Sequence, residues 1–170
     1  MSFERQVCEQ LPHLRRYARS LCGDPAAADD LVQDCLERAL RKRHLWRPKG
    51  RLRAWLFRIL YRTYLNDRTS ARTRREVVTP HAGDPLIARG TQEAHAHCHD
   101  IMAIVDGLPS GQRAAVLLMA VEGPSYRDAA RILDINIGTL RSRLARARET
   151  IRQRCEADAA GAPRYLRRVK

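Results

Sequence analysis

The constraint that most narrows the fold is a helical spacing of apolar residues that runs through almost the whole chain. Apolar side chains recur three and four positions apart, whereas strand-like alternation and the dipeptides of tight hairpins are absent from the sequence. Only two Phe and two Trp are present, so a core must be built mainly from Leu, Ile, Val and Ala. The sequence therefore predicts an all-α protein.

Glycine and proline residues divide this pattern into helices. In the first part of the chain, helices are expected over residues 3–21, 25–42 and 52–71. Gly23 ends the first of them, and Asp24 followed by Pro25 is typical of an N-cap and a first-turn proline. In the second part, helices are expected over residues 92–107, 110–122, 125–133 and 137–155.

The stretch between these two sets of helices has turn and linker chemistry, with Pro80, Gly83 and Pro85 close together. We therefore expect two small helical domains, at 1–76 and 92–155, joined by a flexible linker at 77–91. Residues 156–170 contain Gly161 and Pro163 and are expected to form a tail.

The end of the second domain indicates a helix-turn-helix. A short helix, a turn at residues 134–136 and a long helix rich in arginine follow one another. The long helix would enter the major groove, where arginine can bridge two acceptors on guanine. Its apolar residues are spaced to pack inward, which leaves Thr139, Ser142, Ala145 and Arg146 facing outward.

Positive charge is concentrated in one segment of the chain. The formal net charge is +13, and residues 38–75 alone hold fourteen Arg and Lys against the single acid Asp67. The ordinary interpretation of such a charged segment is a basic face exposed to water. Nucleic acid is the first candidate partner for it, and an anionic membrane surface is the second. A run this lopsided repels itself unless it meets phosphates, however, which favours nucleic acid. Trp46, Tyr61 and Tyr64 lie among these charges and could stack on unpaired bases, whereas Trp55 is expected in the core.

The cysteines and the short apolar runs indicate the cellular compartment in which the protein works. The five cysteines are scattered, odd in number and without a CxxC pair, which argues against a disulfide framework or a zinc ribbon and favours a reducing compartment. No run approaches the roughly 18 apolar residues of a membrane helix, and the polar N-terminus has no secretory apolar region. A cytoplasmic protein without membrane insertion is expected.

One histidine cluster raises the alternative of a metal site. His95 and His99 would lie one turn apart on a helix, with His97 and Cys98 between them, and could share a transition-metal ion. Two ligands are too few for a closed site, so a polar helix start is favoured. No metal or other cofactor is expected.

Several motifs resemble those of a known family. Residues 28–34 (ADDLVQD) and 52–59 (LRAWLFRI) resemble sigma factor region 2. Residues 108–113 (LPSGQR), 122–130 (EGPSYRDAA) and 138–148 (GTLRSRLARAR) resemble region 4. Their order and spacing are similar to those of the extracytoplasmic function (ECF) sigma factors, which carry only these two domains. Residues 20–23 and 59–60 resemble the general-stress-response branch.

The resemblance implies roles that spacing alone does not supply. The second helix would dock on the clamp helices of the polymerase β′ subunit through Asp30, Gln33, Asp34 and Glu37. The loop and third helix would bind the −10 element through Trp46, Lys49, Arg51, Arg53, Arg58, Tyr61 and Arg62. The last helix would read the −35 element through Thr139, Arg141, Ser142, Arg143, Ala145 and Arg146. The implied partners are core RNA polymerase (β′ clamp helices and β flap), promoter DNA and an anti-sigma factor that wraps or separates the two domains and hides both binding faces.

Three positions depart from the family pattern. Arg62 stands where the family often has Asn, and Asp134 stands in the turn where the family often has Gly. Ala145 replaces a larger residue of some members. Arg62 bears on the contacts near the site where the −10 element is opened, and Ala145 bears on the −35 sequence preference.

Other functions compete with the sigma factor interpretation. A plain helix-turn-helix repressor or activator would not need the acidic second helix or the basic third helix. A sigma mimic that titrates an anti-sigma factor should lack a basic recognition helix. An enzyme fits least, because the sequence shows no nucleophile–base set, phosphate loop or closed metal site.

Overall fold

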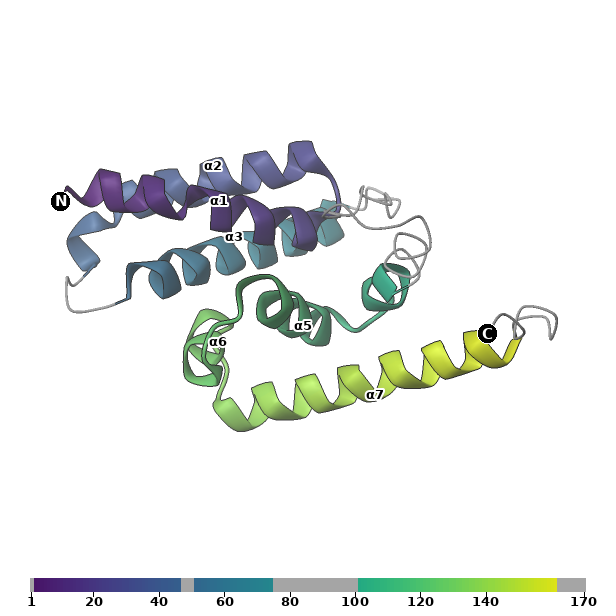
Figure 1. Cartoon of the computed structure of the whole chain (residues 1–170). Helices are drawn as coiled ribbons and strands as arrows, with labels where there is room; N and C mark the ends of the chain where they lie inside the picture. Colours follow the sequence, from purple (N-terminus) through teal and green to yellow (C-terminus); the bar gives the residue numbers. More distant parts are fainter. Residues whose placement is uncertain (1, 47–50, 75–100, 162–170) are drawn as a thin grey trace, which may run out of the picture.

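A computed structural model describes residues 2–46, 51–74 and 101–161, and every regular element within these ranges is a helix. The first domain contains α1 (Phe3–Cys22), α2 (Pro25–Arg41), a short 3-10 turn (Arg43–Leu45) and α3 (Leu52–Arg74). The second contains α5 (Ser110–Glu122), α6 (Tyr126–Ile132) and α7 (Ile137–Gly161), and residues 101–106 are also helical. The all-α prediction is confirmed (Figure 1).

Side-chain caps explain where the helices begin. The Asp24 carboxylate accepts a hydrogen bond of 2.7 Å from the Ala27 amide, directly before Pro25, as the sequence predicts. Ser125 caps α6 by accepting from the Asp128 amide at 3.1 Å. Gly23 ends α1 with φ 74°, a left-handed conformation that favours glycine.

The core of the first domain lies where α1, α2 and α3 meet, because each of these helices packs against the other two. Leu14, Ala18, Cys35, Leu56 and Leu60 are fully buried there. Burial raises the pKa of the Cys35 thiol to about 12, which is consistent with a small apolar core residue rather than a reactive thiol.

The second domain is a helix-turn-helix, as the sequence predicts. The long helix α7 packs against α5 and α6, and Leu118, Ala129, Leu140 and Leu144 are buried between them. Asn136 closes the turn, since its side-chain oxygen accepts from the Thr139 amide at 2.8 Å. The outer face of α7 is therefore held at a set angle to α6.

The two domains pack against each other, which the sequence did not predict. Helix α1 contacts α5, and α3 contacts α6, so the second domain lies along α3 (Figure 1). The buried Tyr17 hydroxyl donates across this interface to the Ala114 carbonyl at 3.2 Å. The predicted flexible linker at 77–91 lies outside the described residues.

Two predicted helix ends are too early. Helix α3 continues to Arg74 rather than to residue 71, and α7 continues to Gly161 rather than to residue 155. Residues 156–161, assigned to a tail, are therefore helical. Arg152 pairs with Glu156 one turn later at 2.8 Å, and residues 139–160 contain no glycine or proline. Helices α1, α2, α5 and α6 agree with the sequence-based ranges to within about one residue. Of the helix predicted over 92–107, residues 101–106 are helical, and residues 92–100 lie outside the described residues.

Leu56→Ala should destabilise the chain, because Leu56 is fully buried in the core of the first domain. Removing its side chain should lower the free energy of unfolding by about 2–5 kcal/mol, measured by urea denaturation. Leu65→Ala provides a matched control on the same helix, since Leu65 is 39% exposed. A similar loss in both variants would contradict the placement of α3.

Candidate nucleic-acid and polymerase interfaces

The basic face of α3 is turned toward the second domain. Arg51, Arg53, Arg58 and Arg62, all expected to bind the −10 element, each pair with a carboxylate there. Counter-charges from the same chain therefore neutralise much of this face. Lys49, the fifth cation predicted for this site, lies outside the described residues.

The aromatic residues predicted for the −10 site lie in different surroundings. Trp46 is half-buried directly after the 3-10 turn, and its ring centroid lies 5.3 Å from that of Phe3 in α1. Tyr61 is buried beside Tyr64, and burial raises its pKa, opposed by the nearby charge of Arg143. In this arrangement Tyr61 is closed to an unpaired base.

Glu122 is the most enclosed of the carboxylates that face the first domain. Its side chain is 2% exposed, at the end of α5. The Arg53 guanidinium donates to Oε2, Arg16 Nε donates to Oε1 at 3.2 Å, and His13 Nδ1 lies 2.9 Å from Oε2. A buried carboxylate needs such partners, because its desolvation is costly unless it is paired and hydrogen-bonded.

Asp128 and Asp134 extend the same contact along α3. Asp128 is nearly buried, accepts from the Arg51 guanidinium and also accepts from the Ser125 hydroxyl at 2.7 Å. Asp134 is exposed in the turn, and the hydrogen bond from Arg62 together with the charge of Arg58 lowers its pKa. Three acids spread over α5, α6 and the turn thus follow the basic face of α3.

Arg113 makes a second kind of contact between the domains. Its guanidinium, only 13% exposed, donates to the Leu21 carbonyl at 2.9 Å and the Ser20 carbonyl at 3.1 Å. These carbonyls lie in the last turn of α1, where the helix dipole favours a cation. Asp106 holds the same guanidinium from its own domain at 2.9 Å.

Sequence reasoning missed the role of these interface residues. The motif segments 108–113 and 122–130 were singled out only for their resemblance, and no partner was assigned to Arg113, Glu122 or Asp128. A usable signal existed in the charge distribution, since a strongly basic segment in a folded chain requires nearby counter-charges. The sequence does not reveal which acids supply them.

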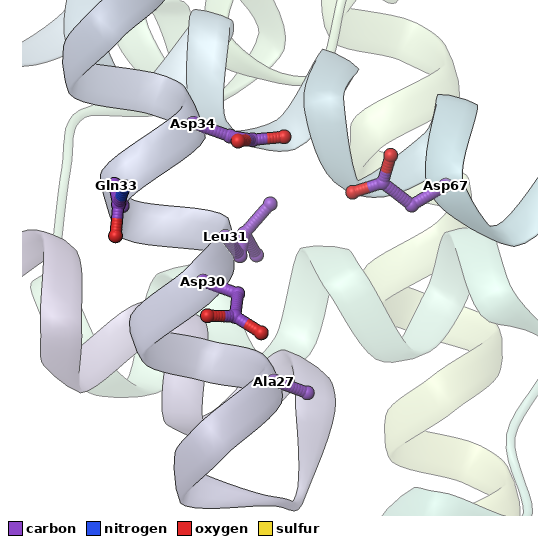
Figure 2. A pocket seen from close by; sticks show the side chains of 6 residues that line it. All are labelled: Ala27, Asp30, Leu31, Gln33, Asp34 and Asp67. Carbon is purple, nitrogen blue, oxygen red and sulfur yellow. The ribbon is translucent and has the colours of Figure 1, made fainter.

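The residues predicted to contact polymerase share one face of α2. Asp30, Gln33, Asp34 and Glu37 are exposed, as the helical spacing predicts. Figure 2 shows Asp67 of α3 directed toward Asp34 across a cleft of about 440 Å³ that Asp30 and Gln33 also line. Partial burial, together with the charge of Asp34, raises the pKa of Asp67. The cleft is a negatively charged recess on an otherwise basic protein.

The outer face of α7 carries most of the residues predicted to read the −35 element. Arg141, Ser142, Ala145 and Arg146 are exposed, and Thr139 is half-exposed in the first turn. Arg143 departs from this face. Its guanidinium lies against Gly111 of α5, so close that a Cβ there would fall 2.9 Å from the Arg143 Cζ. In this arrangement Arg143 contacts its own domain rather than the open surface.

Two absences apply only to the described part of the chain. Among the helices described, none combines the length and apolar character needed to cross a bilayer. Within residues 2–46, 51–74 and 101–161, no three metal-binding side chains gather into one group. The histidine cluster at 95–99 lies outside these ranges.

Comparison with known proteins identifies both domains. Residues 7–61 match the family described as the Sigma2 domain of PhyR, and residues 98–151 match Sigma-70, region 4. A curated relative is the ECF RNA polymerase sigma factor EcfG of Rhodopseudomonas palustris (strain TIE-1), 36% identical over 94% of this chain and 88% of that protein. The RNA polymerase sigma-E factor of Streptomyces avermitilis is 32% identical over 92% of this chain and 87% of that protein.

A solved structure supports the same relationship. The sigma factor RpoE from Bartonella quintana, crystallised in complex with the anti-sigma factor NepR, superposes with a TM-score of 0.71. It is 32% identical and covers 92% of this chain and 98% of its own. The chain belongs to the ECF sigma factors of RNA polymerase. Within that family, its similarity to EcfG and to the PhyR domain confirms the predicted relationship to the general-stress-response branch.

Glu122→Gln should loosen the contact between the domains. The substitution removes the charge that three groups of the first domain share, and it should lower the free energy of unfolding by about 1–3 kcal/mol. Glu156→Gln is the matched control, because Glu156 is exposed and pairs with Arg152 on its own helix. Thermal unfolding of the two variants measures the difference. Equal stability would show that Glu122 does not hold the domains.

Proposed function

We propose that this chain binds core RNA polymerase and directs it to promoters, with the first domain recognising the −10 element and the second reading the −35 element. It acts by binding rather than by catalysis, and it acts in the cytoplasm, where the polymerase is. The main support is that neighbouring helices of the first domain carry opposite charge: exposed acids on α2, and arginines on α3 that pair with carboxylates of the second domain. One face suits a basic protein partner and the other suits phosphates.

The proposed polymerase contact is the acidic face of α2. Asp30, Gln33, Asp34 and Glu37 are exposed on one side of the helix, and the cleft toward Asp67 adds a further carboxylate. Such a surface would attract basic side chains on the clamp helices of β′. Contacts of the second domain with the β flap complete the proposed polymerase interface.

The proposed promoter contacts divide between the domains. In the first domain, the DNA backbone around the −10 element would be held by Arg51, Arg53, Arg58 and Arg62. Trp46 and Lys49 would add contacts next to these arginines. Tyr61 would reach DNA only after the domains rearrange. In the second, Thr139, Arg141, Ser142, Ala145 and Arg146 would enter the major groove, and Arg143 would support them from behind. Phosphate contacts position the protein, and base contacts supply sequence preference.

We further propose an anti-sigma factor of the NepR kind as the regulatory partner. The solved relative RpoE is bound to NepR, and the first domain of this chain matches the Sigma2 domain of PhyR. An anti-sigma factor that covers either charged face of the first domain would block the corresponding step of initiation.

Reconstituted transcription tests the proposal as a whole. Core polymerase with the purified chain, incubated with a pool of genomic DNA, should produce discrete transcripts that core polymerase alone does not. Absence of specific transcripts, together with operator binding by the chain alone, would favour a plain helix-turn-helix regulator instead.

Asp34→Asn should weaken binding to core polymerase by about tenfold, equivalent to about 1.4 kcal/mol, if Asp34 meets a basic side chain. Fluorescence titration of labelled chain with core polymerase measures this. Asp29→Asn is the matched control on the same helix, since Asp29 faces α1 and lies 3.9 Å from Arg15. Equal affinity of the two variants would remove Asp34 from the interface.

Arg146→Ala should cost about 1–3 kcal/mol in −35 recognition, if its guanidinium makes a bidentate base contact. Arg152→Ala is the control, because Arg152 lies further along α7 and pairs with Glu149 and Glu156. Competition between −35 sequence variants in a holoenzyme-binding assay measures the preference. An unchanged preference in Arg146→Ala would exclude this role.

A further inference from the structure

Two residues that depart from the family pattern contact each other in the structure. These residues are Arg62 of α3 and Asp134 of the turn before α7, which the resemblance marks as departures. The Arg62 Nη2 donates to Asp134 Oδ2 at 2.6 Å, and the Arg58 Nη2 donates to Asp134 Oδ1 at 2.6 Å. A single carboxylate of the second domain therefore engages two arginines of the first, one through each oxygen.

The backbone at Asp134 does not itself call for a carboxylate. Its φ of 55° lies in the left-handed region, which glycine adopts without strain and which aspartate and asparagine tolerate better than other residues. Glycine would fit the turn at least as well. The benefit of aspartate at this position therefore comes from its side chain, whose contacts all lie on α3.

The Asp134 pairs lie at the exposed edge of the contact between the domains. A small cleft of about 230 Å³ also lies between the domains, beside Glu122 and Asp128 and lined by Ala54 and Leu118. The Asp134 pairs are themselves exposed, so salt and competing anions weaken them.

We propose that Asp134 acts as an internal substitute for a DNA phosphate, holding Arg58 and Arg62 in a closed arrangement that promoter DNA must displace. The inference rests on the proposed DNA-binding role of these two arginines. It adds an autoinhibitory contact built into this chain, separate from any anti-sigma factor. A phosphate and the Asp134 carboxylate offer the same chemistry to a guanidinium, namely paired anionic oxygens.

The closed arrangement would lower the apparent affinity of the first domain for DNA. The apparent dissociation constant equals the intrinsic constant divided by the fraction of open molecules. If about one molecule in ten is open, complete release of the contact would strengthen DNA binding by up to about tenfold.

Asp134→Asn in the full-length chain tests the proposal, because asparagine tolerates the same backbone conformation and removes the charge. Two quantities are measured: the radius of gyration by small-angle X-ray scattering, and the dissociation constant for a fluorescent single-stranded DNA of mixed sequence. The variant should have a larger radius and bind about three- to tenfold tighter. Glu149→Gln is the control, since it changes the net charge equally but pairs only within α7.

Arg62→Asn provides a second variant that isolates the closure from DNA binding. It removes one of the two Asp134 pairs and leaves the Arg58 pair, so it should enlarge the radius of gyration less than Asp134→Asn does. Combining the two substitutions should add little to Asp134→Asn alone, because the charge of Asp134 is already absent. Additive enlargement would overturn the pairing.

The outcomes separate the closure from the proposed function. If the Asp134→Asn chain is as compact as the parent and binds DNA with unchanged affinity, the Asp134 pairs do not hold the domains closed. Tighter binding in both Asp134→Asn and Glu149→Gln would attribute the gain to net charge and would also overturn it. If the Asp134→Asn chain is more open but binds DNA no tighter, Asp134 does not keep Arg58 and Arg62 from DNA. The proposed DNA-binding role of these two arginines would then be wrong.

Discussion

The arrangement of the two domains depends on the meeting of guanidinium groups with carboxylates across one interface. The basic face of α3 carries charges that would repel one another in isolation, and Glu122, Asp128 and Asp134 lie opposite them. Arg113 adds the reverse contact, from the second domain to the carbonyl end of α1. Tyr17 and the apolar residues near it complete the contact, but the ionic partners align α3 with the second domain.

The contact between the domains covers one of the proposed binding surfaces and leaves the other two exposed. The acidic face of α2 and the outer face of α7 remain open to partners in the closed chain, whereas the arginines of α3 are occupied. Under the proposed function, polymerase would contact α2 before the domains separate, and the proposed −10 face of α3 would become available only afterwards. In the proposed function, polymerase binding by the acidic α2 would therefore come before −10 binding by the basic α3. This order would follow from the positions of the charges and would need no catalytic chemistry.

The sequence predicted the helices and the surface residues well, because both follow from local spacing. The cap at Asp24, the exposed acids of α2 and the helix-turn-helix all depend on residues a few positions apart. The burial of Tyr61 and the inward turn of Arg143 could not be predicted, since both depend on packing between distant segments. Likewise, two departures from the family pattern, Arg62 and Asp134, were visible separately, and only the fold showed that they are partners.

The most direct test of this account is the distance between α2 and α7, measured by spin labels at exposed positions of both helices. The free chain should give a short distance, corresponding to the closed arrangement, and the same chain in an active complex with core polymerase and promoter DNA should give a clearly longer one. An unchanged short distance in a transcribing complex would show that the domains need not separate, and would contradict the account.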